Sequence, residues 1–248
     1  MLKKLAVCAI VAAACFGCSS SRKQQDLPPP QEMFDQGRAL FDRREFLRSA
    51  EKFDLLEREY PFSELVPRAQ VMSAFAFYKA RRYDDTIMAV NRFLHLNPAD
   101  KDAPWAYYIR AQALYEQVSD FRRDQKITEQ AYQAFSEVVR RFPDSEYAKD
   151  ARQKLVVLTD FLAGHEMEIG RFYQANRMHT ASLNRFLTVL ERYPRSVVLP
   201  EALLRITEVY ITIGLPEDAR KYAVLLGTNF PDSKWYARAY ELVNRHAD

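Results

Sequence analysis

Glycine is scarce in this 248-residue chain, and its scarcity excludes several classes of protein. Only six residues are Gly, and no Asn-Gly or Asp-Gly pair occurs. All-β sandwiches and barrels use such turns often, so the chain is not predicted to be one of them. No two glycines lie closer than Gly164 and Gly170, which excludes a Gly-rich phosphate-binding loop.

An excess of either charge is also missing. The chain has 36 basic and 33 acidic residues, and removal of Lys3 and Lys4 with a leader would leave a net charge of +1. A balance this close to neutral gives no case for nucleic acid as a partner. The apolar content of 48% and the charged content of 28% exclude a disordered chain.

Cysteine is absent after the first 18 residues. Residues 1–17 are predicted to be a secretory signal peptide, because two lysines precede an apolar run of about 12 residues, which is short for a bilayer core of about 30 Å. Cys18 follows the small residue Gly17, which resembles a bacterial lipoprotein processing site. The resemblance implies cleavage before Cys18 and its acylation by chains such as palmitate, which would form a stable membrane anchor.

Two other interpretations of this leader stay open. Cys15 and Phe16 stand where lipoprotein signals usually have Leu and then Ala or Ser, so Cys15 is an alternative lipidation site. An ordinary cleaved signal with a free Cys is the other. Ser19 after Cys18 implies, in lipoproteins of this kind, transport onward to the outer membrane. With Cys18 acylated, the mature chain has no thiol for a disulfide, a nucleophile or a metal site.

A proline preceded by an apolar or amide residue recurs along the chain. Residues 18–30 are predicted to be a polar, Pro-rich linker that acts as a semi-rigid spacer. From residue 31 onward the apolar residues recur with a helical period, interrupted by five prolines that are 37, 45, 51 and 37 residues apart. These spacings approach the 34-residue period of tetratricopeptide repeats (TPRs), with insertions. The five prolines are Pro61, Pro98, Pro143, Pro194 and Pro231.

The predicted fold is therefore an all-α superhelical solenoid of about five TPRs over residues 31–248. Small residues occupy the middle of the predicted first helices, at Gly37, Ala74, Ala111 and Gly170. Residues 118–126 are predicted to be an insertion between the helices of the third repeat, and residues 233–246 a C-terminal capping helix. An irregular helical bundle is the alternative.

Enzyme chemistry has no support in the sequence. The four histidines lie in different repeats without the spacing of metal ligands, and His165-Glu166 lacks a second His because Ile169 stands in its place. No catalytic residue, metal or cofactor is predicted. A muramidase with a helical solenoid is the enzyme alternative, but it needs a catalytic domain, and only the capping helix follows the repeats.

The whole chain resembles the BamD family, the lipoproteins of the outer-membrane β-barrel assembly machine. The most specific segments are 60–63 (YPFS), 74–79 (AFAFYK) and 142–148 (FPDSEYA). Ala111, where the family often has Gly, and the insertion depart from its pattern. The resemblance implies a non-enzymatic scaffold, anchored by lipid on the periplasmic face of the outer membrane, that helps fold and insert outer-membrane β-barrel proteins.

The resemblance also implies partners. The C-terminal repeats are expected to bind the periplasmic domains of the barrel-forming subunit, and the N-terminal repeats to receive unfolded outer-membrane proteins. Other assembly lipoproteins are expected in the same complex. The alternative is another envelope TPR lipoprotein that scaffolds cell-wall synthesis or division.

A peptide groove is predicted on the concave face, which the first helix of each repeat lines in a TPR stack. The family resemblance implies a ligand that ends in an aromatic residue with a free carboxylate, and an apolar groove with Arg or Lys suits such an end. The alternative is that the aromatic side chains only fill gaps between helices. The candidate groove residues are Phe34, Arg38, Phe41, Arg68, Phe75, Tyr78, Lys79, Tyr108 and Tyr115.

Overall fold

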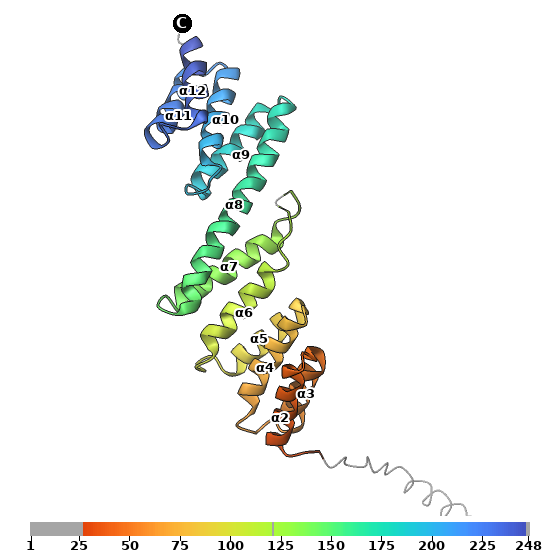
Figure 1. The fold of residues 1–248 in the computed structure, drawn as a ribbon. Helices are drawn as coiled ribbons and strands as arrows, with labels where there is room; N and C mark the ends of the chain where they lie inside the picture. Colours follow the sequence, from red (N-terminus) through yellow and green to blue (C-terminus); the bar gives the residue numbers. More distant parts are fainter. Residues whose placement is uncertain (1–26, 121, 247–248) are drawn as a thin grey trace, which may run out of the picture.

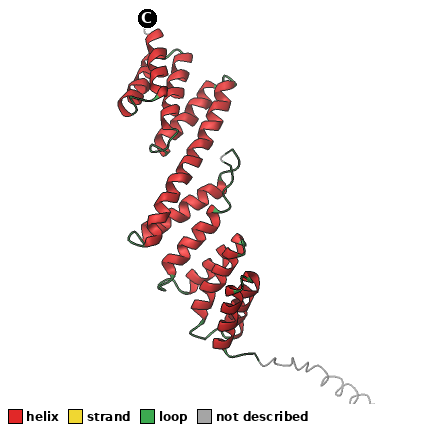
Figure 2. Ribbon diagram, in the orientation of Figure 1, coloured by secondary structure: helices red, strands yellow, loops and turns green. Residues whose placement is uncertain are grey.

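The computed structural model describes residues 27–120 and 122–246. The predicted signal peptide, Cys18 and most of the linker therefore lie outside the described residues. The described part consists of α-helices and turns, without a strand, which confirms the predicted all-α TPR solenoid (Figure 2). None of its helices combines the length and the apolar character that crossing a bilayer requires.

Five helical hairpins follow one another and stack along one axis, with the first hairpin at one end and the last helix at the other (Figure 1). Neighbouring first helices touch one another, α4 with α6 and α6 with α8, which places them on the inner curve of the stack. The hairpins are α2 (Pro30–Asp42) with α3 (Phe46–Glu59), α4 (Val66–Lys79) with α5 (Tyr83–Leu96), α6 (Ala103–Tyr115) with α7 (Lys126–Arg141), α8 (Glu146–Ala175) with α9 (His179–Arg192), and α10 (Leu199–Thr212) with α11 (Pro216–Asn229), followed by α12 (Lys234–Arg245).

The second helix of every hairpin ends in the same way. The terminal residue has φ between −139° and −128° and ψ between 49° and 59°, and a proline follows it. A residue before proline is excluded from the α conformation by the proline ring, so each of these helices stops there. The five terminal residues are Tyr60, Asn97, Phe142, Tyr193 and Phe230.

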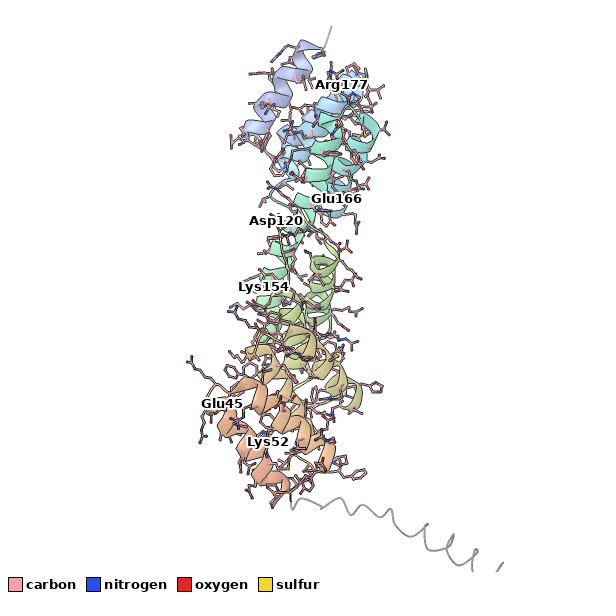
Figure 3. The ribbon with its side chains drawn as sticks, turned by 90° about the vertical axis from the view of Figure 1, so that its right-hand side faces the viewer. Glu45, Lys52, Asp120, Lys154, Glu166 and Arg177 are labelled. Carbon is pink, nitrogen blue, oxygen red and sulfur yellow. The ribbon has the colours of Figure 1, made fainter. Side chains whose placement is uncertain are left out.

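The first helix of four hairpins ends at a residue with positive φ. The angle is 63° at Arg44, 59° at Arg81, 60° at Arg177 and 79° at Gly214. Each residue closes a Schellman turn, as where the Glu45 N–H donates to the Leu40 carbonyl at 3.0 Å. Glycine is the usual residue here, and the left-handed conformation costs a side-chain-bearing residue about 1–2 kcal/mol. Figure 3 labels Glu45 beside the first of these turns and Arg177 in the third, near opposite ends of the stack.

Bare glycines let the two helices of a hairpin approach closely at two points. A Cβ added at Gly37 would lie 2.7 Å from a ring carbon of Phe53, and one added at Gly170 would lie 2.4 Å from a ring carbon of Phe186. Both rings are completely buried. The small residue in the first helix and the aromatic residue in the second therefore form one packing unit.

Helix α8 joins the third hairpin to the fourth without a break. Its 30 residues correspond to about 45 Å, at about 1.5 Å per residue. Its N-terminal part packs on α7 and α6, where the Tyr108 hydroxyl donates to Asp150 at 2.8 Å. Its C-terminal part packs on α9, and Asp160 accepts from the Ser196 hydroxyl at 2.8 Å. This shared helix accounts for the proline spacing of 51 residues.

Candidate peptide groove

Four aromatic rings form a continuous row across the first three hairpins, which we call the aromatic ladder: Phe46, Phe41, Phe75 and Trp105. Phe41 stacks on Phe75 with ring centroids 5.3 Å apart and an interplanar angle of 25°. Phe46 meets Phe41 edge-on at 5.2 Å, and Trp105 meets Phe75 edge-on at 5.8 Å. All four side chains are only partly buried, so the ladder keeps accessible apolar surface.

The ladder crosses the first helices diagonally. Phe41 lies four residues after Gly37, Phe75 follows Ala74 directly, and Trp105 precedes Ala111 by six residues. Each step from one repeat to the next therefore moves toward the N-terminal end of the first helix. Phe41 and Phe75 were both predicted as groove residues from the sequence, and the structure brings these two together.

A cavity of about 490 Å³ opens at the first end of the ladder, and we call it the Phe41–Lys79 pocket. Phe41 and Phe46 form its apolar walls, and Asp42, Arg44 and Lys79 complete its lining. The Lys79 Nζ also lies 5.2 Å from the centroid of the Phe75 ring. Within the part of the chain that the structure describes, neither Arg44 nor Lys79 forms an ion pair, so both charges stay available.

The prediction of a groove residue was wrong at Phe34. This side chain is only 2% exposed, because its ring packs against Phe53 with centroids 5.3 Å apart inside the first hairpin. The Arg68 guanidinium lies over the same ring at 5.1 Å, which links α4 to α2. Arg38 is exposed and forms no ion pair with the described residues.

Tyr108, half-buried, sits between helices in the middle of the stack. Its ring lies 5.3 Å from that of Tyr147, and its oxygen accepts from the Gln112 amide at 2.6 Å and donates to Asp150. Burial, and then the hydrogen bond to Asp150, raise the pKa of Tyr108 to about 12. These contacts make Tyr108 a link between α6 and α8.

Tyr115 and Tyr78 are also held by neighbouring side chains. The Tyr115 ring packs against Phe135 at 6.0 Å and carries the Lys154 Nζ at 4.5 Å. The Tyr78 hydroxyl lies 3.5 Å from Glu116, and burial followed by the charge of Glu116 raises the pKa of Tyr78. For Tyr78, Tyr108 and Tyr115, gap filling between helices accounts for most of the observed contacts.

Three residues of the aromatic ladder and the Phe41–Lys79 pocket were not predicted from the sequence: Phe46, Trp105 and Arg44. Candidate positions were counted from the small residue of each first helix, whereas Phe46 begins a second helix and Arg44 lies in the turn before it. Their place beside the hairpin turn was the available signal. In residues 27–120 and 122–246, His, Asp and Glu nowhere gather in a group able to hold a metal ion.

Stacked helical hairpins, in which every second helix ends before a proline, define a TPR solenoid protein. A family model described as outer membrane lipoprotein, YfiO, matches residues 27–225, and the chain belongs to this family. The chain is similar to the outer membrane protein assembly factor BamD of Caulobacter vibrioides, with 39% identity over 239 residues that cover 95% of this chain and 78% of that protein.

A second relative covers both chains almost completely. The outer membrane protein assembly factor BamD of Rickettsia prowazekii is 34% identical over 247 residues, which cover 99% of this chain and 98% of that protein. Among solved structures, a thermophilic TPR protein of Thermus thermophilus aligns with a TM-score of 0.41 at 17% identity, covering 86% of this chain and 98% of that one. The family expected from the sequence segments is thereby confirmed.

Proposed function

We propose that this chain, an outer membrane protein assembly factor by family, is a non-catalytic scaffold that receives unfolded outer-membrane proteins on its N-terminal repeats. The single observation that carries the proposal is the aromatic ladder, which runs unbroken over three repeats and ends beside two cations without ion pairs in the described structure. The partly buried rings keep apolar surface that an extended ligand can cover.

The ligand that fits the ladder is an extended segment. Side chains on one face of a strand repeat about every 6.7 Å, which is similar in scale to the 5.3 Å and 5.8 Å steps of the ladder. Alternate apolar side chains can therefore contact successive rings, while Arg and Lys pair with a carboxylate. The C-terminal strand of an outer-membrane protein has this character.

The C-terminal repeats are proposed to bind the periplasmic domains of the barrel-forming subunit. Their hairpin turns expose apolar side chains, with Met178 at 54%, Ile213 at 41% and Leu215 at 45% exposure. Apolar side chains on exposed turns are typical of a protein-binding surface. Acylated Cys18 is proposed to hold the scaffold on the periplasmic face of the outer membrane, in one complex with other assembly lipoproteins.

Fluorescence anisotropy with a labelled peptide from the C-terminal strand of an outer-membrane protein tests the proposal. Phe75→Ala removes the central ring of the ladder and is expected to weaken binding about tenfold or more. Phe172→Ala is the matched control, because Phe172 is 63% exposed on α8 and lies outside the ladder. Equal loss in both variants, or no loss in Phe75→Ala, would overturn the proposal.

A charge variant tests the two arginines predicted in the groove. Arg38 and Arg68 are both exposed, so Arg38→Glu combined with Arg68→Glu is expected to keep the fold. We expect this double variant to bind the same peptide more weakly, with an unchanged circular dichroism melt. An unchanged affinity would remove these two arginines from the groove.

A further inference from the structure

Phe62 is the most exposed large apolar side chain among the described residues, with an exposed fraction of 100%. The next value is 75%, at Val197. Phe62 lies between α3 and α4, in the loop that joins the first hairpin to the second. A single exposed apolar residue needs no explanation by itself, so any role for this ring has to be argued from its surroundings.

The turn that carries Phe62 does not require an aromatic residue. The Ser63 N–H donates to the Tyr60 carbonyl at 3.0 Å, which closes a β-turn with Pro61 in its second position and Phe62 in its third. The loops after the four later second helices close the same turn, with corresponding distances between 3.0 and 3.2 Å. Their third positions are all exposed and hold Ala99, Asp144, Arg195 and Asp232. The fold thus accepts small, acidic and basic side chains here, and only the first copy of the turn presents a large apolar one.

This loop lies where the described chain begins. The Tyr60 hydroxyl donates to the Pro28 carbonyl at 3.1 Å and lies 3.4 Å from the Leu27 carbonyl oxygen. These contacts hold the start of the described chain against the loop, at the end of the stack where α2 begins (Figure 1). Cys18 precedes Leu27 by nine residues, and a chain of nine residues spans at most about 30 Å. An acylated Cys18 therefore keeps the loop within about that distance of the membrane.

We propose that the loop of residues 60–63 is a second membrane contact, in which the Phe62 ring enters the lipid interface on the periplasmic face of the outer membrane. Phe and Trp side chains of interfacial segments bury themselves at the boundary between headgroups and acyl chains. A lipid anchor alone lets the protein pivot about one point, whereas a second contact fixes how the first repeat faces the membrane. The proposal rests on the acylation of Cys18 in the proposed function.

The charges beside Phe62 indicate which lipid surface fits the loop. Glu59 and Glu64 are both exposed, and the Glu59 carboxylate pairs with the Arg58 guanidinium at 3.1 Å. Carboxylates are repelled by the negative surface potential of anionic lipids. The contact is therefore apolar and made among zwitterionic headgroups. Because salt screens only charge interactions, the contact is expected to persist at high salt concentration.

Quenching by spin-labelled lipid tests the contact in the full acylated chain. With Cys18 acylated, the mature chain has no thiol, so the substitution Glu64→Cys introduces a single site for a fluorophore beside Phe62. In phosphatidylcholine vesicles that contain spin-labelled lipid, we expect this fluorophore to be quenched. Adding Phe62→Ala is expected to abolish the quenching, and adding Phe62→Trp to retain it. Ala99 occupies the equivalent position of the second turn, so Phe62→Ala keeps the turn.

A fluorophore introduced by Val197→Cys is the matched control. Val197 follows Ser196 in the fourth turn as Glu64 follows Ser63 in the first, and it is also exposed. We expect no quenching at residue 197, because this turn lies far along the stack from the start of the described chain (Figure 1). Equal quenching at residues 64 and 197, or unchanged quenching after Phe62→Ala, would overturn the proposal.

The remaining outcomes separate this proposal from the proposed function. Mass spectrometry of the same sample reports the state of Cys18. An acylated Cys18 without quenching at residue 64 would overturn the membrane contact and leave the anchor standing, whereas an unmodified Cys18 would overturn both. Protection of the residue 64 fluorophore only after a partner protein is added would assign the loop to a protein interface and overturn the membrane contact.

Discussion

The first three repeats and the last two bury their apolar side chains in different ways. From residue 27 to Leu158, the buried side chains form three separate clusters, one for each successive part of the stack. From Leu162 onward, sixteen buried residues of α8 to α12 form a single cluster. Small independent clusters allow neighbouring repeats to open separately, whereas one shared cluster makes a segment fold as a unit. The aromatic ladder therefore lies in the half whose repeats have separate buried clusters.

The hairpin turns differ between the same two halves. The turns of the first two hairpins carry the pairs Arg43-Arg44 and Arg81-Arg82, which complement the negative ends of their helix dipoles. The turns of the last two hairpins expose Met178 and Leu215 at the corresponding place. Arg177 keeps one exposed basic residue in the fourth turn, so this edge of the stack carries fewer basic and more apolar side chains toward its C-terminal end.

The largest expected loss of stability comes from removing one completely buried ring from each half of the molecule. Phe186→Ala and Phe53→Ala each delete a completely buried ring, at a cost of about 3–5 kcal/mol. Hydrogen exchange is expected to accelerate throughout α9–α12 in Phe186→Ala, and only over α2–α4 in Phe53→Ala. An equally wide response in both variants would contradict the difference between the two halves.

A proline in α8 is expected to separate the halves. Thr159→Pro removes a helical hydrogen bond between the cluster that ends at Leu158 and the single large cluster that begins at Leu162. The cost is about 3 kcal/mol or more. Calorimetry should then show two transitions in place of a coupled one. Thr159→Ala is the control, since it removes only the hydroxyl that donates to the Leu155 carbonyl. A single unshifted transition in the proline variant would refute the coupling.

A smaller effect is expected at the two buried glycines. Gly170→Ala and Gly37→Ala each push a methyl group against a ring, and overpacking of this kind costs about 1–3 kcal/mol. The approach is closer at Gly170, and its ring belongs to the single large cluster, so chemical denaturation should show the greater loss for Gly170→Ala. The opposite order would indicate that the C-terminal core adjusts more easily.

The smallest effect is a pH dependence in the N-terminal half. The folded pKa of Tyr108, about 12, lies above its usual value of 10.0, so its contribution to stability is complete below pH 10 and is lost as pH rises toward 12. We expect the parent protein to lose more stability than Tyr108→Phe between pH 10 and pH 12, as measured by chemical denaturation at a series of pH values. Parallel curves for the two proteins would exclude this link.

The ends of the second helices could be predicted from the sequence, whereas the burial of individual side chains could not. The prolines predict where the second helices end, because the proline ring excludes the α conformation for the residue directly before it. The unbroken α8 has no such marker, since residues 146–175 contain no proline. Phe34 and Phe41 share one helix and one chemistry, and only the position of Phe53 across the hairpin decides that the first is buried.

Helix α8 connects the two halves of the molecule as one continuous helix. Near its N-terminal end, Asp150 accepts a hydrogen bond from Tyr108, and further along Asp160 accepts one from Ser196. The helical backbone is continuous between these two contacts. A displacement of the last two repeats is therefore transmitted through α8 to α6, which carries Trp105 at one end of the aromatic ladder. On the proposed function, a force exerted by a partner at one end of the molecule would in this way act on a ligand held at the other.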